Sequence, residues 1–553
     1  MKKKDPYIPV LPGHIKDADD TRTDILQALG MEDLKPMNIG SYNEGYHDPP
    51  VAAIMVGGEQ YSVKKVLERV GSRMKKVDAL EKASAGSYSY GFCWDKVAAK
   101  GSRLGAAATL PTDTANFGHF GSVNADYSNP FDAIYPWSGR KLCNIDLTLY
   151  AALRPGDSIT DCVKAWEGDE AFSYDDEAGV WVYTPEFWGI AYEENGLRYF
   201  YVSAVEVEGY IHYPEGIDGR WHGGIYSVGG KNLLLPKPGM PGKRVAVGTL
   251  HSYAKNYGAT IDNIFSVDAS TLLMVVEYAN MNSQAACGSG ADSMYRQSSD
   301  MFTAASTGAV VHVAKSAAAS HAYPGAIFDI GTSDGGVQVG SFLVSSVAEN
   351  ADGTTLDVTL TTDGVTPANV TVATTNFWSV HGVGNTKDEA VGSKSGYIGT
   401  NGKCQAYYRG MELYSNIWHY VLGAYRQSGT AHIWVAKDEE EADAYDALNT
   451  SVHRDTGLTL SSSGYVQELG MAVDFGLCIP PFCTAVGGSS TAPVGDYCYT
   501  PDVSAGNTIL LLGGIASNGS DGGRFCGSWN GTSGSSNWYY GARPRLKNPL
   551  GDC

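Results

Sequence analysis

The chain lacks three features that would place it in a common class at once. It has no run of about 18 apolar residues, so no membrane-spanning helix is predicted. Its ten cysteines form no CxxC pair and have no histidine cluster beside them, so no metal site is predicted. Its first residues, MKKKDP, carry charge but no apolar segment follows, so no signal peptide is predicted.

Positive charge is also scarce. Only 18% of residues are charged, and the formal net charge is −20. Nucleic acids and anionic membranes bind positively charged faces, so this balance argues against both as partners. The chain is rich instead in glycine (67), tyrosine (34) and tryptophan (11). This composition is typical of a β-rich protein with many turns, because helical bundles carry more Lys, Glu and Leu.

A short heptad pattern follows the first 57 residues. Apolar side chains recur at spacings of four and three from Val63 through Leu67, Val70 and Met74 to Val77. The pattern predicts a helical stalk suited to self-association. An amphipathic helix that lies on its own domain fits the same pattern, and two heptads alone do not hold an oligomer.

Three later segments give local predictions. Apolar residues at 272, 275, 276 and 279 share one face of a helix that Asp268 or Ser270 can cap. Residues 341–347 and 354–362 alternate on either side of a turn at 350–353, which predicts a β-hairpin. Residues 438–447 are acidic and predict a solvated helix face.

The last fifty residues combine a strand with a possible recognition loop. The apolar run 508–512 leads into DGGRFCGSWNGTSGSSNWYY, and GARPRL favours a final strand. Gly and Ser bury no core by themselves. Rigid aromatic rings among small polar residues are typical of adaptable binding surfaces. A glycine-rich loop with packed aromatic rings explains the same composition equally well.

Three segments, in this order, resemble the formylglycine-generating-enzyme type of C-type-lectin fold. EYANMNSQ (277–284) is similar to that family's helix motif. GME (410–412) with SNIW (415–418) is similar to its turn, and GGRFCGSWNG with GARPRL is similar to its C-terminal ending. The region from residue 136 onward is also similar to C-terminal domains of phage tail and fibre proteins, including variable proteins targeted by diversity-generating retroelements.

The sequence departs from the catalytic members of this family. Those members use two nearby cysteines that bind copper, whereas no second cysteine follows Cys526 before Cys553. His419 stands where the family has an acidic residue, and Ser415 replaces a glycine. A thiolate pair is the minimum for that copper chemistry. The resemblance therefore implies the fold without catalysis, and without a cofactor or metal.

Together these observations predict an α+β, β-rich fold. An extended N-terminal arm and a short helical stalk precede a C-type-lectin-like domain that carries a β-rich insertion. The expected divisions are an anchoring arm (1–57), a helical or coiled-coil stalk (58–86), a collar or linker (87–130), the first part of the lectin-like domain (131–299), the β-rich insertion (300–400) and the second part with the ligand-binding segment (401–553).

The resemblance implies a non-catalytic phage virion protein. It would be a tail fibre or receptor-binding protein that recognises a bacterial surface receptor, glycan or protein, for host attachment. The other expected partners are virion proteins, bound through the N-terminal arm, and two further copies of the chain in a homotrimer. The expected location is the surface of the phage particle, after synthesis in the host cytoplasm. Diversification of the C-terminal segment by a retroelement belongs to the same expectation.

In the retroelement-targeted relatives, ligand-facing positions lie in the C-terminal segment. Aromatic residues are expected to carry most of the binding energy, because they dominate recognition and stack on sugars. The family motif keeps Trp529 and Arg543, which favours a structural role for both. The candidate ligand-binding residues, mapped by motif, are Asn518, Ser520, Asp521, Arg524, Phe525, Ser528, Trp529, Asn530, Ser533, Ser535, Ser536, Asn537, Trp538, Tyr539 and Tyr540.

Two other classes of protein stay open. A tailspike glycan hydrolase needs a carboxylate pair, and carboxylates at 175–177, 206 and 208 are available without a defining spacing. A capsid or baseplate decoration protein without a receptor role would use the same fold for packing alone. Burial of the C-terminal segment against a neighbouring subunit favours decoration, and its exposure favours receptor binding.

Overall fold

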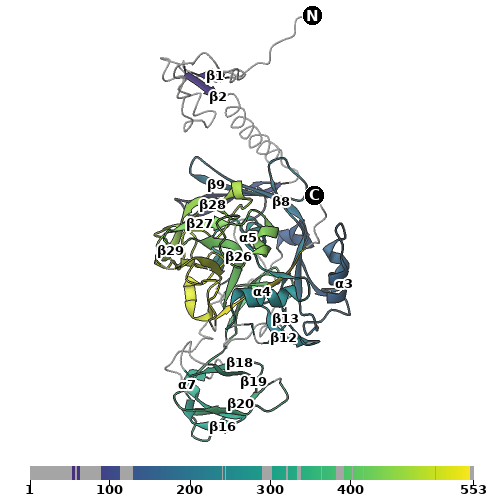
Figure 1. The fold of residues 1–553 in the computed structure, drawn as a ribbon, viewed down its shortest axis with the longest axis vertical. Coiled ribbons are helices and arrows are strands. Elements are labelled where there is room, and N and C mark those ends of the chain that lie inside the picture. The colour runs from purple at the N-terminus through teal and green to yellow at the C-terminus, as the bar shows by residue number, and fades with distance from the viewer. Residues whose placement is uncertain are drawn as a thin grey trace, which may run out of the picture. The chain divides into compact units, whose positions relative to one another are not determined.

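The structure is a computed structural model (Figure 1). It divides into two compact units, Met1–Ala85 with Val207–Gly209 and Gly86–Glu206 with Tyr210–Cys553. The residues that it describes are 53–56, 59–62, 89–111, 129–239, 241–242, 244–288, 302–318, 322–332, 338–362, 364–380, 392–400, 403–414, 416–502, 504, 506–537 and 539–547.

In the first unit, two strands are described between residues 53 and 62. β1 (Ala53–Val56) pairs antiparallel with β2 (Glu59–Ser62). The expected helical stalk at 58–86 therefore contains a strand near its start, and that part of the prediction is wrong. The heptad residues of the stalk, and the expected arm up to residue 52, lie outside the described residues.

The predicted α+β class is wrong, although the protein is β-rich. Of the described residues, 41% lie in strands and 16% in helices. Strands form the framework because the chain is rich in aromatic and β-branched residues, and because its many glycines interrupt helices. No described helix is both long enough and apolar enough to cross a bilayer.

The second unit begins with a five-stranded antiparallel sheet. Phe92, Phe200 and Val202 on one face are buried in the main core, while Tyr192 and Tyr199 stack on the other face with ring centroids 4.8 Å apart. Strands from the expected collar segment (87–130) belong to this sheet. The order is β10 (Ile211–Tyr213), β8 (Phe187–Glu194), β9 (Leu197–Ser203), β3 (Ser89–Asp95) and β4 (Lys100–Gly105).

Two six-stranded sheets carry the C-terminal part of the chain. The first has the order β14 (Thr260–Ile261), β35 (Pro544–Lys547), β11 (Gly216–Gly219), β7 (Trp181–Thr184), β5 (Lys141–Ile145) and β6 (Val163–Trp166). The second has the order β28 (Arg454–Thr459), β27 (His432–Val435), β26 (Trp418–Arg426), β32 (Thr508–Leu512) and β33 (Gly527–Ser528), with β34 (Tyr540–Gly541) parallel to β26. The predicted final strand is thus confirmed as β35, between β14 and β11.

Smaller sheets and short helices complete this unit. The small sheets are β12 (Gly224–Val228) with β13 (Lys231–Leu235), then β23 (Gly396–Thr400), β24 (Lys403–Tyr408) and β25 (Met411–Tyr414), and then β30 (Cys483–Val486), β29 (Gly464–Leu469) and β31 (Tyr497–Cys498). The helices are η2 (Pro130–Ala133), η3 (Trp137–Gly139), α3 (Leu147–Ala152), η4 (Ile159–Cys162), α4 (Val247–Lys255), α6 (Ser283–Cys287), α8 (Glu439–Ala444), η5 (Val473–Phe475) and η6 (Ala516–Asp521).

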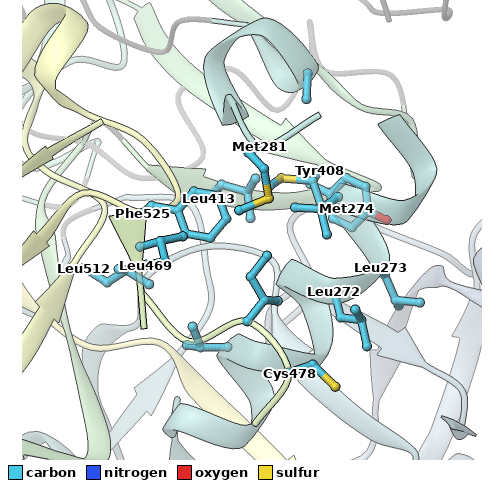
Figure 2. Close-up of a cluster of buried hydrophobic side chains, with 14 of the residues drawn as sticks. Leu272, Leu273, Met274, Met281, Tyr408, Leu413, Leu469, Cys478, Leu512 and Phe525 are labelled. Atoms are coloured by element: carbon cyan, nitrogen blue, oxygen red, sulfur yellow. The ribbon is translucent and has the colours of Figure 1, made fainter. Parts of the chain in front are cut away.

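Helix α5 (Ile264–Tyr278) lies inside the main core (Figure 2). The helix begins at Asn263, whose side chain accepts hydrogen bonds from the backbone of Phe265 and Ser266. The sequence therefore predicted the helix correctly but placed its cap, at Asp268 or Ser270, too late. The apolar residues on one face did not reveal where the helix begins, because α5 is buried around nearly its whole circumference.

Residues 302–380 form a β-rich part with its own core, where Phe328 stacks on Trp378 at 4.8 Å. The predicted hairpin is confirmed, because β19 pairs with β20 and Gly353 supplies the positive φ of the turn. The elements are β15 (Phe302–Ala304), β17 (Val310–Ala314), β20 (Thr355–Thr361), β19 (Gln338–Glu349), β18 (Ile327–Gly331) and β22 (Phe377–Val380) in one sheet, β16 (Ser306–Gly308) with β21 (Val370–Val372), and helix α7 (Lys315–Ala318).

Candidate functional site

The C-terminal segment is fastened to the core by two buried charged residues. The Arg524 guanidinium donates to Thr271 Oγ1 and to the Val267 carbonyl of α5, both at 2.8 Å. The Asp496 carboxylate accepts from the Phe525 backbone N–H at 2.7 Å and from Ser283 Oγ at 3.2 Å. These bonds fix the middle of the segment inside the protein, so only its flanks reach the surface.

Beside this anchor, three tyrosines from another part of the chain meet the segment. Tyr465 on β29, Tyr497 on β31 and the nearby Tyr499 are half-buried. The rings of Tyr465 and Tyr497 lie 5.2 Å apart, and those of Tyr497 and Tyr499 lie 4.6 Å apart. Asn518 and Asp521 from η6 complete the group. We call these five residues the tyrosine surface.

Hydrogen bonds hold the tyrosine surface in one arrangement. The hydroxyl of Tyr465 donates to Asp521 Oδ1 at 2.5 Å, and that of Tyr499 donates to Asp521 Oδ2 at 3.2 Å. The Asn518 amide donates to the Tyr499 hydroxyl at 2.9 Å and accepts from the Ile515 backbone at 2.7 Å. A ligand would therefore meet rings that are already ordered, which lowers the entropic cost of binding.

The pKa values of Tyr465 and Tyr499 are raised, so these two phenols stay protonated at neutral pH. The hydrogen bond to Asp521 is the main cause that raises the pKa of Tyr465, and burial is the main cause that raises the pKa of Tyr499. Neutral phenols offer a ring face and a hydrogen-bonding hydroxyl together, the combination that recognition surfaces use. Among the described residues, no group of His, Cys, Asp and Glu could hold a metal ion.

The structure divides the predicted ligand-binding residues into two groups. A ligand approaching from solvent does not reach the buried group, because its side chains are packed in the core. The buried residues are Arg524, Phe525, Ser528, Trp529 and Tyr540, at 7% exposure or less. The half-buried or exposed residues are Asn518, Ser520, Asp521, Asn530, Ser533, Ser535, Ser536, Asn537 and Tyr539. Trp538 lies outside the described residues.

Sequence reasoning missed the three tyrosines of the surface. A signal was present, because YCY at 497–499 places two tyrosines two residues apart, the spacing that puts side chains on one face of a strand. Tyr465 carries no such signal, since only the pairing of β29 with β31 brings it opposite Tyr497. The place of Tyr465 in the tyrosine surface therefore depends on the tertiary structure.

Two motif residues, Glu412 and Arg543, belong to a polar cluster inside the protein. His222 Nδ1 lies 3.5 Å from Glu412 Oε1, and His419 Nε2 lies 3.7 Å from Asp262 Oδ2. Arg543 Nε lies at the same 3.7 Å from Asp262 Oδ2. Burial lowers the pKa of both histidines, so both are neutral at physiological pH. All five residues are at most 4% exposed, so the cluster supports the fold and is closed to ligands.

Comparison with protein-family models and with curated proteins finds no match to this chain.

Proposed function

We propose that this chain is a non-catalytic phage virion protein that attaches to a bacterial surface ligand through its C-terminal domain. The observation that carries the proposal is the tyrosine surface, where Asp521 of the C-terminal segment orients Tyr465 and Tyr499. The motif resemblance to retroelement-targeted phage proteins supports the same assignment. The proposal places ligand contacts on the tyrosine surface and on the exposed flank from Asn530 to Asn537.

The composition of this surface suits recognition more than packing or catalysis. Half-buried tyrosines contribute contact area with little loss of side-chain entropy, and Ser and Asn adapt their hydrogen bonds to the ligand. Truncation of an aromatic anchor of an interface to alanine typically costs about 2 kcal/mol or more of binding free energy. The loss of two anchors should therefore be visible in a simple binding assay.

The experiment compares the purified chain with the double variant Tyr465→Ala and Tyr497→Ala in binding to bacterial cells and cell-surface extracts. Tyr199→Ala is the matched control, because Tyr199 is also half-buried and stacked on another tyrosine but lies on β9. The proposal expects binding by the wild type and the control, and at least a tenfold loss in the double variant. Equal binding by all three chains would indicate that the receptor site lies elsewhere. No binding by any of them would favour the alternative of a capsid or baseplate decoration protein.

Three finer expectations remain part of the proposal. Sedimentation of the full chain tests the homotrimer. Reconstitution with the other virion proteins tests attachment through residues 1–57. Sequencing of the neighbouring DNA tests diversification by a retroelement, which predicts an imperfect repeat of the codons for 513–546 beside a reverse-transcriptase gene.

A further inference from the structure

The second unit contains a pocket of ≈ 230 Å³ that shares no residue with the tyrosine surface. Distant parts of the chain build it: β10 and β11, the first turns of α5, the start of α8, and Arg545 of β35. Its volume lies just below the usual range for ligand sites, about 300–1,000 Å³. The pocket therefore suits a ligand about the size of one ring.

One wall of the pocket is apolar and fixed. Phe187 lies on it, stacked on Tyr213 with ring centroids 4.7 Å apart and planes 14° apart. Phe265 and Ala269, one helical turn apart on α5, continue the same wall and remain half-buried. Phe187 is fully buried, so a flat apolar face bound here would remove only Phe265 and Ala269 from water, without disturbing the core.

Another wall of the pocket carries a compact ionic group. Arg545 donates to Asp218 Oδ1 at 2.8 Å and to Glu439 Oε1 at 3.1 Å. Gly216 lets the guanidinium lie against the backbone, since a Cβ there would come within 3.0–3.2 Å of it. The buried Nε of Arg545 has no hydrogen-bond partner within the described structure. Burial also raises the pKa of Glu439, whose side chain is still 24% exposed.

The charges of the lining decide which ligand fits. Arg545 balances one of the two negative charges of its carboxylates, and Lys437 Nζ lies 3.9 Å from Asp438 Oδ2. An anionic ligand would face three carboxylates, and a cation would have to compete with Arg545. A neutral ligand with several hydroxyls meets neither obstacle, because carboxylate oxygens accept from hydroxyls in strong, charge-assisted hydrogen bonds.

We propose that this pocket binds a single neutral sugar ring. The C–H face of the ring would lie on the partly exposed Phe265 and Ala269, and its hydroxyls would donate to Glu439. A sugar ring has one apolar face and a hydrogen-bonding edge of hydroxyls. The apolar wall of the pocket matches the first, and its ionic wall matches the second. The site is independent of the proposed receptor surface, because other residues form it. Its test uses free monosaccharides as probes.

The test titrates the full chain with D-glucose, D-galactose, N-acetyl-D-glucosamine and N-acetyl-D-galactosamine, by saturation-transfer NMR and calorimetry. N-acetylneuraminic acid is the charged comparison. We expect at least one neutral sugar to bind with a Kd of about 1–10 mM, and at least tenfold tighter than the charged sugar. Absence of neutral-sugar binding up to about 50 mM overturns the proposal, as does equal binding of the charged sugar.

Two variants locate the binding. Ala269→Trp fills the pocket from α5, and Glu439→Gln keeps the shape of the polar wall but removes a charged acceptor. The first should abolish sugar binding and the second should weaken it at least fivefold, while Tyr199→Ala should bind normally. If Ala269→Trp does not fold, as judged by circular dichroism, Glu439→Gln decides. Unchanged binding in the folded variants would place the sugar elsewhere and contradict the proposal.

Discussion

Glu277 and Arg409 form a two-point ion pair in the core. Nε and Nη2 of Arg409 each lie 2.7 Å from one carboxylate oxygen of Glu277. Tyr408 and Asn129 donate to the same carboxylate, at 2.7 and 2.6 Å. The pair joins the end of α5 to the turn between β24 and β25. The motif segment 277–284 is therefore joined to the residue that directly precedes the motif segment 410–412.

Glu277→Gln should destabilise the second unit strongly. The change removes the buried counter-charge of Arg409 and leaves only the exposed Asp132, 3.1 Å from Nη2. Breaking one side of a buried pair costs about 3–5 kcal/mol. Urea unfolding followed by tryptophan fluorescence measures the loss. The exposed Glu194→Gln is the control and should change stability by less than about 0.5 kcal/mol. A similar stability for both variants would contradict the structural role of the pair.

Tyr465→Phe should show whether the order of the tyrosine surface matters for binding. The variant keeps the ring and removes the hydroxyl that donates to Asp521. We expect a partial loss of cell binding, about three- to tenfold, since one hydrogen bond of a charged acceptor contributes about 1 kcal/mol or more. Titration of cells with labelled protein measures it. If Tyr465→Phe binds as weakly as Tyr465→Ala, the ring itself contributes nothing.

Gly523→Ala should destabilise the C-terminal segment, because a Cβ at this position would overlap the buried Asp496 carboxylate. Overpacking of this kind costs about 1–3 kcal/mol. Gly534→Ala, eleven positions further along the same segment, is the matched control, because a Cβ there meets only Thr532 Oγ1 at 3.9 Å. Thermal unfolding of both variants measures the difference. Equal melting temperatures would show that Asp496 does not pack against the segment.

Asp496→Asn should flatten the pH dependence of stability. Burial raises the pKa of Asp496 from 3.8 to about 7. Because the folded state holds the proton more tightly than the unfolded chain, this contribution to stability is present below pH 3.8 and is lost as pH rises through about 7. The free energy of unfolding should therefore fall less between pH 6 and 8 in the variant than in the wild type. Urea titrations at both pH values measure the change.

The control for the pH prediction is Asp474→Asn, at an exposed aspartate on η5. It should keep the pH dependence of the wild type. Buried His419 acts in the opposite direction, since burial lowers its pKa and stability is lost as pH falls below about 6.5. His419 is present in both variants, so their difference isolates Asp496. An unchanged slope in Asp496→Asn would contradict the raised pKa.

Features that depend on neighbouring residues could be predicted from the amino-acid sequence. It predicted the hairpin around 350–353, since the strand alternation and Gly353 lie within one short stretch. The acidic stretch 438–447 also predicted a solvated helix, and the structure shows α8 over part of it with Ala442 and Asp443 buried. The β-rich composition was equally visible, as was β35. Each of these rests on local propensity, which a short stretch of sequence carries in full.

Which side chains of the C-terminal segment are exposed depends on tertiary packing. Arg524, Phe525 and Trp529 look like recognition residues in sequence, yet α5 and Asp496 draw them into the core. Tyr465 and the pocket wall at Arg545 gain their roles from partners 56 and 327 positions away. Burial and long-range pairing depend on how all elements pack together, and no local pattern records them. For that reason the sequence identified the C-terminal segment as a candidate, whereas the fold determines which of its residues are exposed.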